Sequence, residues 1–130
     1  MREQISAIAA VLTGIIAYFV GGFDPLFTVF ATILVLDTLT GMLKAWNFGQ
    51  YESKKFRQGI VHKFGYIIGI ILIVQFDKLM MGNNVLRDSV ITFFIANEGM
   101  SILENLGAMG VKLPTAFENA IKSLNDKNEK

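Results

Sequence analysis

Apolar residues along the chain gather in four stretches, which short polar groups and turn-forming residues separate. The first stretch, from Ile5 to Phe23, has 19 residues and no charged side chain. As a helix rising about 1.5 Å per residue it would be roughly 28 Å long, enough to cross the hydrocarbon core of a bilayer. No clear small-x-small cleavage site separates it from the next stretch, so we interpret it as a retained spanning helix rather than a signal peptide.

A tight turn follows the first stretch, at Gly21-Gly22-Phe23-Asp24-Pro25. Glycine permits the chain to reverse, and Pro25 suits the first turn of a helix because its missing N–H needs no partner there. The second stretch runs from Leu26 to Leu43 and contains one charged residue, Asp37. Trp46 lies just beyond it, where an indole side chain favours the membrane interface. These features predict a second spanning helix.

The third stretch, Phe64 to Phe76, is strongly apolar but has only 13 residues. It crosses a bilayer if the polar residues that flank it lie at the two interfaces, or if the helix extends at either end. Ahead of it, apolar residues recur every four positions from Phe56 to Phe64, which predicts an amphipathic helix on the bilayer surface. We place the spanning helix at about residues 60–81.

The fourth stretch, Val85 to about Leu106, is interrupted by charged and amide side chains, so hydropathy alone leaves it undecided between a spanning and an interfacial helix. Charge favours a crossing. The segment from Lys44 to Lys63 carries five basic residues against one acidic residue, and the positive-inside rule places it in the cytoplasm. Four crossings then put both termini, and the four lysines of the tail, in the cytoplasm, whereas three crossings leave those lysines outside.

The chain is therefore predicted to be an all-α, multi-pass protein of the bacterial cytoplasmic membrane. Its transmembrane domain covers residues 1–110, with helices at about residues 5–23, 26–46, 60–81 and 85–106. Residues 111–130 form a cytoplasmic amphipathic tail with a short soluble helix. Hydrophobic residues make up 52% of the sequence and charged residues 18%, which is too apolar for a soluble domain of this size.

Several classes of function are excluded by what the sequence lacks. A net charge of +1 argues against a nucleic-acid binder, which would carry a clear basic excess. Cysteine is absent and His62 is the only histidine, so we expect no metal site and no cofactor. No phosphate-binding loop or nucleophile–base pair is present, and the chain is predicted not to be an enzyme.

Ionisable residues inside the apolar stretches cost about 2.5–3.5 kcal/mol each on insertion scales and therefore indicate a role. Asp37 lies roughly 13 Å along the helix from Trp46, near the bilayer midplane. Helical spacing puts on one face Asp37, Thr40, Gly41 and Lys44. A similar stripe in the fourth stretch comprises Asn97, Ser101, Glu104 and Asn105, with Glu98 one position round the helix. These stripes either join helices through hydrogen bonds and ion pairs, or line water when several copies assemble.

Gly65 and Gly69 lie on one face of the third helix. Small residues at this spacing allow a neighbouring helix to approach closely. This spacing is also common by chance. The two glycines therefore either pack against a neighbouring helix or have no particular role.

A proton-coupled or cation transporter is a competing interpretation of Asp37 and Glu98. Small four-helix multidrug exporters use a lone membrane carboxylate in this way, but they are almost free of loops, whereas this chain has a long basic loop and a polar tail. A membrane scaffold without a pore is a third interpretation, in which the polar stripes serve only packing.

Three blocks of the chain carry more specific information. They are Asp37-Thr38-Leu39-Thr40-Gly41 with Lys44-Ala45-Trp46, Glu52-Ser53-Lys54-Lys55 with Gly59-Ile60-Val61-His62-Lys63, and Asn97-Glu98-Gly99-Met100-Ser101-Ile102-Leu103-Glu104-Asn105-Leu106 with Gly110-Val111 and Leu113-Pro114. In this order they resemble the phage holin family that includes holins of Gram-positive phages and the clostridial toxin-secretion holins. The resemblance runs from about Leu26 to Leu124, and its third block is the most specific.

The resemblance implies a protein that oligomerises with itself among the membrane lipids and opens lesions. Through these lesions an endolysin reaches the cell wall, or large toxins leave the cell, without necessarily binding the holin directly. Phage lysis and toxin export use the same membrane event, and both remain open. Carried over residue by residue, the candidates for assembly or pore lining are Asp37, Lys44, Lys63, Asn97, Glu98, Ser101, Glu104 and Asn105.

Overall fold

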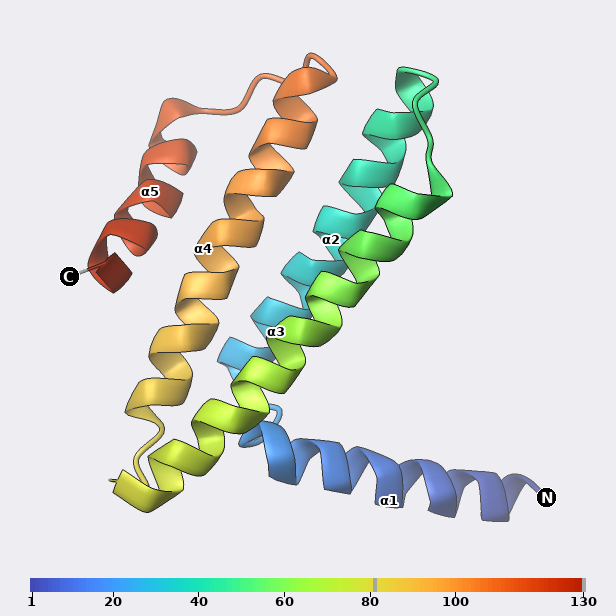
Figure 1. The fold of residues 1–130 in the computed structure, drawn as a ribbon, viewed down its shortest axis with the longest axis vertical. Coiled ribbons are helices and arrows are strands. Elements are labelled where there is room, and N and C mark those ends of the chain that lie inside the picture. The colour runs from blue at the N-terminus through green and yellow to red at the C-terminus, as the bar shows by residue number, and fades with distance from the viewer. Residues whose placement is uncertain (81, 130) are drawn as a thin grey trace.

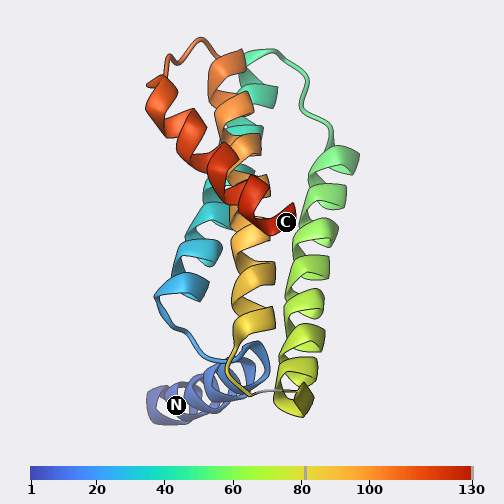
Figure 2. The same ribbon diagram turned by 90° about the vertical axis from the view of Figure 1, so that its left-hand side faces the viewer.

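The computed structural model describes residues 1–80 and 82–129, and every regular element in these ranges is a helix. Helices α2, α3 and α4 run alongside one another as a bundle, α1 leaves one end of the bundle at a steep angle, and α5 folds back beside α4 (Figures 1 and 2). The predicted all-α class is confirmed. The helices in chain order are α1 (Arg2–Val20), α2 (Pro25–Asn47), α3 (Ser53–Met80), α4 (Val85–Ala108) and α5 (Thr115–Glu129).

Three of the described helices, α1, α2 and α3, are long and apolar enough to cross a membrane, with mean hydropathies of 1.7, 1.9 and 1.8. Helix α4 has 24 residues, which is also a spanning length. It carries four charged side chains, Arg87 and Asp88 near its start and Glu98 and Glu104 further on. A crossing by α4 therefore depends on how the bundle buries those groups.

Helix α3 is longer than the sequence pattern indicates. It begins at Ser53, seven positions before residue 60, and the apolar repeat from Phe56 to Phe64 belongs to this same helix. The amphipathic segment expected there is therefore the first part of α3 and not a helix of its own. Gly59 is the weakest helix former in this segment, less favourable than alanine by about 1 kcal/mol, and one such residue does not stop a helix. The expected end at Met81 lies outside the described residues.

The tail forms the short helix that the sequence predicts. Helix α5 runs to Glu129, and Lys130 lies outside the described residues. Helix α5 contacts α4 along the bundle rather than extending away from it (Figure 2).

The turn between α1 and α2 forms as the sequence predicts. Gly21 ends α1 in the left-handed region, with φ of 84°, where glycine has no steric penalty. Asp24 caps α2 by accepting a hydrogen bond of 3.0 Å from the Phe27 N–H, and Pro25 occupies the first turn.

The core of the bundle is small and lies between α2, α3 and α4, with the last residue of α1, Val20, at its edge. Aromatic rings make much of it, and Tyr66 of α3 stacks on Phe94 of α4 with ring centroids 4.4 Å apart. Many large apolar side chains elsewhere are exposed, for example Val61 and Leu72 on α3. Exposure on this scale is expected for a surface that contacts lipid. The buried apolar cluster comprises Val20, Phe27, Phe30, Ile70, Val74 and Ile91.

Candidate functional site

An ion network joins the three helices of the bundle near its middle. Lys63 of α3 donates from Nζ to Asp37 Oδ2 of α2 at 2.8 Å and to Glu98 Oε2 of α4 at 3.2 Å. Tyr66, one turn further along α3, donates its hydroxyl to Glu98 Oε1 at 2.9 Å. The side chains of Lys63, Asp37 and Glu98 are only 16%, 14% and 9% exposed. One lysine therefore holds two carboxylates from two different helices.

The network has more negative than positive charge, because two carboxylates share one ammonium group. Asp37 Oδ1 is buried and has no hydrogen-bond partner within the described residues. Buried charges are tolerated where partners compensate their lost hydration, and removal of one partner leaves an uncompensated charge. Lys63 is thus the residue on which the burial of both acids depends.

A second polar contact joins α2 to α4 on the same side of the network as the basic loop, as we call the connection at residues 48–52 together with Lys54, Lys55 and Arg57 at the start of α3. Asn105 donates from Nδ2 to Thr40 Oγ1 at 3.1 Å, and Thr40 is buried. Gly41 lies beside this contact, where an added Cβ would be 3.8 Å from Asn105 Nδ2. Thr40 and Asn105 therefore extend the polar connection from the ion network toward the end of α4.

The candidate residues of α4 divide between two faces of the helix. Glu98 and Asn105 point into the bundle, Ser101 is half-buried, and Asn97 and Glu104 are exposed. Asn97 and Glu104 are seven positions apart and share a face, whereas each neighbouring residue in sequence is about 100° further round. The polar residues of α4 are therefore partly buried inside the bundle and partly exposed on the outer face of the helix.

The remaining candidates lie at the edges of this network. Lys44 is half-buried near the end of α2. Gly69 faces α4, and an added Cβ would be 3.9 Å from the Phe94 ring, whereas Gly65 is exposed and would meet nothing within 4 Å. A packing role for Gly65 therefore needs a neighbouring molecule and remains a prediction.

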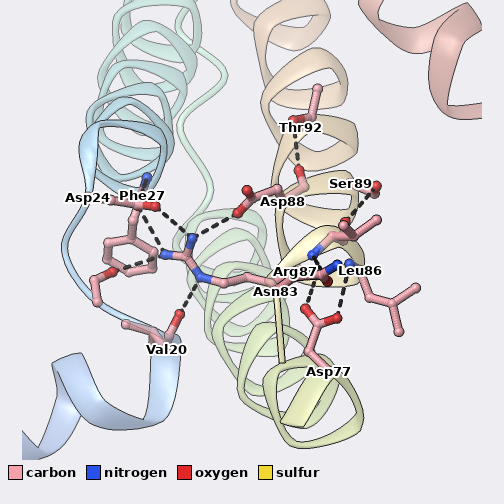
Figure 3. Close-up of polar contacts among 12 residues, drawn as sticks. Val20, Asp24, Phe27, Asp77, Asn83, Leu86, Arg87, Asp88, Ser89 and Thr92 are labelled. Atoms are coloured by element: carbon pink, nitrogen blue, oxygen red, sulfur yellow. Dashed lines mark hydrogen bonds and ion pairs between the residues drawn. The ribbon is translucent and has the colours of Figure 1, made fainter. Parts of the chain in front are cut away.

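A buried arginine at the opposite end of the bundle has a role that the sequence did not reveal. Arg87 is 0% exposed, and its guanidinium reaches across to the turn between α1 and α2 (Figure 3). It binds Asp24 in bidentate geometry, with Nη1–Oδ2 at 2.8 Å and Nη2–Oδ1 at 3.1 Å. It also donates to the carbonyls of Val20 at 2.7 Å and Gly22 at 3.0 Å, and to Asp88 at 3.0 Å.

The backbone of Arg87 is held as firmly as its side chain. Asp77, near the end of α3, accepts the N–H groups of Leu86 at 3.2 Å and Arg87 at 2.8 Å (Figure 3). These are free N–H groups at the start of α4, where Asn84 provides no side-chain cap. The Arg87 cluster, as we call Asp24, Asp77 and Arg87, thus joins the ends of α1 and α3 to the beginnings of α2 and α4.

The sequence contained one indication of this cluster. Asp24 and Arg87 carry opposite charges, and the positive-inside rule places their two turns on the same side of the membrane. Their separation in the sequence, however, does not indicate that the two side chains are in contact. The Arg87 hydrogen bonds lower the pKa of Asp24 below its ordinary value, which keeps this carboxylate charged.

Gly21→Ala is expected to destabilise the protein more than Gly22→Ala. Both glycines have positive φ, 84° and 105°, so each alanine carries a backbone penalty of about 1–2 kcal/mol. Only at Gly21 would the new Cβ also clash, at 2.7 Å from Arg87 Nε and 2.8 Å from Arg87 Cδ. Thermal unfolding of the two variants in detergent isolates the clash. Equal melting temperatures would contradict the close approach of Arg87.

Comparison with known proteins decides the family. The sequence pattern of the bacteriophage holin family matches residues 14–126, which include the ion network and the Arg87 cluster. The chain belongs to the bacteriophage holin family. A protein named as a probable holin, from Bacillus phage phi105, is 35% identical over 95 residues that cover 73% of this chain and 70% of the phage protein.

Proteins from bacteria are as similar to this chain as the phage protein is. The protein YqxH of Bacillus subtilis is 36% identical over 95 residues, which are 73% of this chain and 68% of YqxH. A 14.9 kDa protein from the nagH 3′ region of Clostridium perfringens is 37% identical over 109 residues, 82% of each chain. No solved structure matches this holin-family chain. Membership of the family implies a non-enzymatic membrane protein.

Proposed function

We propose that several copies of this holin-family chain assemble in the bacterial cytoplasmic membrane and open a lesion. Through it, a phage endolysin or a large exported protein would leave the cytoplasm. The observation that carries the proposal is the ion network at the middle of the bundle, where Lys63 holds Asp37 and Glu98. A subunit that must first reside in lipid needs such groups paired internally, because a bilayer core offers them no water.

The same network supports a change of state on assembly. Two acids compete for one lysine, so a small rearrangement of α2 or α4 exchanges partners without leaving Lys63 alone. Asn97 and Glu104, which already lie on the outer face of α4, then supply further polar groups toward a shared wet surface. Assembly of identical subunits is favoured because each copy offers only part of such a lining.

The arrangement of the turns supports four crossings. The turn at residues 21–24 and the connection at residues 82–84 lie at one end of the bundle, and the basic loop and the end of α4 lie at the other (Figure 1). With the basic loop in the cytoplasm, α4 returns the tail to that side. In this proposal α1 also crosses, which requires it to turn about Gly21 and Gly22 from its present steep angle to the bundle and to release the Val20 carbonyl from Arg87.

The proposal is tested by expressing the chain in a bacterium together with a cytoplasmic endolysin that has no export signal. We expect the membrane potential to collapse, β-galactosidase to appear in the medium, and the cell wall to be degraded. Cells with the endolysin alone should stay intact. A polarised, tight membrane at high levels of inserted protein would contradict lesion formation.

The transporter interpretation predicts the opposite membrane behaviour, with tight cells and pH-dependent export that Asp37→Asn or Glu98→Gln abolishes. It requires a carboxylate free to exchange its cation, whereas Lys63 occupies both acids here. A scaffold without a pore predicts neither leakage nor export.

A further inference from the structure

A cavity of about 310 Å³ opens between α2 and α3 at the end of the bundle that the basic loop joins. It extends from exposed residues of that loop to the ion network. Its deep end is lined by Asp37 and Lys63, and its rim includes Lys44 of α2 and Lys55 of α3. The cavity is thus a recess with a mixed polar and apolar lining and a cation on each wall.

Two glycines create this space, one on each wall. Gly41 and Gly59 both line the cavity. An added Cβ at Gly59 would meet nothing within 4 Å, and one at Gly41 would meet only Asn105 Nδ2 at 3.8 Å. Glycine inside a helix costs about 1 kcal/mol relative to alanine, and here no close helix contact explains that cost. The missing side chains leave room in the recess instead.

The charges along the two walls follow the helical repeat. On α2, Gly41 lies one turn from Asp37 and nearly one turn from Lys44, and on α3, Gly59 lies one turn from both Lys55 and Lys63. Each glycine therefore separates a charge at the deep end from a lysine at the rim.

The rim lysines are available to a ligand in a way that the deep lysine is not. Lys63 is occupied by its two acids. Lys55 contacts Glu52 at 3.6 Å, but both side chains are more than half exposed, and such pairs contribute little. A stronger anion between Lys44 and Lys55 would displace Glu52 at small cost.

We propose that this recess binds the phosphate group of an anionic glycerophospholipid between Lys44 and Lys55. The proposal rests on the membrane-spanning placement of α2 and α3 described above, which puts the rim at headgroup depth. Basic recesses between spanning helices on the cytoplasmic side are suited to such headgroups. The Tyr51 and Phe56 rings, 6.4 Å apart, also line the recess, where aromatic groups favour the interface. Its apolar lining at Met42 and Ile60 suits the start of the acyl chains.

The test measures lipid binding to the purified full-length protein by native mass spectrometry. Phosphatidylglycerol should bind at least tenfold more tightly than phosphatidylcholine, because only the former leaves the phosphate charge uncompensated. Free glycerol 3-phosphate is the competitor that separates a lipid from a soluble phosphate ester. If it displaces the lipid at similar concentrations, or if the two lipids bind equally, the lipid site is overturned.

Matched variants separate the recess from the general charge of the loop. Lys44→Gln and Lys55→Gln should each weaken phosphatidylglycerol about fivefold, the effect expected of one basic residue at an anionic surface. Lys54→Gln removes the same charge from a residue outside the recess and should change binding less than twofold. Equal losses for Lys54→Gln and Lys55→Gln would contradict a defined site.

A filling variant tests the glycines directly. Gly59→Leu should abolish selective binding by occupying the recess, whereas Gly65→Leu adds the same side chain to an exposed face of α3 and should leave binding intact. Leakage of cells that express these variants is measured separately. If the wild-type protein opens lesions but binds the two lipids equally, only this site is overturned. If it binds phosphatidylglycerol selectively but opens no lesions, only the proposed function is overturned.

Discussion

Arg87→Met is expected to destabilise the protein by about 3 kcal/mol, because it removes several hydrogen bonds of a buried guanidinium, and hydrogen bonds to charged groups contribute roughly 1.5–3 kcal/mol each. Methionine fills a similar length but donates no hydrogen bond. Asp24 and the carbonyls of Val20 and Gly22 would lose their shared donor, while the Asp77 contacts to the backbone N–H groups would remain. Chemical unfolding of the purified protein in detergent measures this loss.

Three further variants define the Arg87 effect. Arg57→Met removes an exposed arginine from α3 and should change stability by less than about 0.5 kcal/mol. Arg87→Lys should recover only part of the loss, because an ammonium group cannot reproduce the bidentate contact. Adding Asp24→Asn to Arg87→Met should recover part of it by removing the unpaired charge. If Arg87→Met unfolded at the same denaturant concentration as Arg57→Met, the cluster would not hold the two turns together.

Lys63→Met is the second change with a large expected effect, about 3–5 kcal/mol. Two carboxylates would remain inside the bundle with no cation, and within the described part of the chain Asp37 already has one oxygen without a hydrogen-bond partner. The variant should therefore accumulate poorly in membranes and unfold easily in detergent. Immunoblots of membrane fractions and unfolding curves measure the two effects. Lys55→Met, at an exposed position on the same helix, provides the matched control.

The triple variant Asp37→Asn, Lys63→Met, Glu98→Gln tests why Lys63 matters. It removes all three charges while it keeps side-chain volumes similar, and neutral replacement of a buried charged network is often tolerated. We expect it to regain most of the stability lost in Lys63→Met. We also expect its leakage to fall well below that of the wild type, because the exchange of partners proposed for assembly needs both acids and the lysine. A stable triple variant that leaks as much as the wild type would contradict a role of the ion network in opening the lesion.

Much of the fold was predictable because it depends on local sequence. The two apolar stretches before residue 44 predicted α1 and α2, and the glycines and Pro25 predicted the turn between them. The start of α3 was not predictable from hydropathy. Polar residues between Ser53 and Lys63 interrupt the apolar pattern, but they do not interrupt the backbone hydrogen bonds of a helix.

The candidate site was predictable in its residues but not in its partners. Asp37, Lys63 and Glu98 were each conspicuous as charges in or beside apolar stretches, yet sequence spacing cannot pair groups on three helices. Tyr66 was missed because a tyrosine in an apolar stretch is ordinary until its hydroxyl is found on Glu98. The two glycines of the recess were equally inconspicuous, because an absent side chain has meaning only when the facing wall is known.

The amino-acid sequence is sufficient to establish that this protein is helical, belongs in a membrane and carries charged residues within its apolar segments. These properties follow from the periodicity, length and hydropathy of single segments. Only the folded chain shows that Lys63 binds two acids. It also shows that Arg87 binds Asp24, 63 residues earlier in the sequence, and so joins the turn before α2 to the turn before α4. Those contacts depend on which faces of α2, α3 and α4 meet, and packing of apolar side chains across the bundle selects those faces.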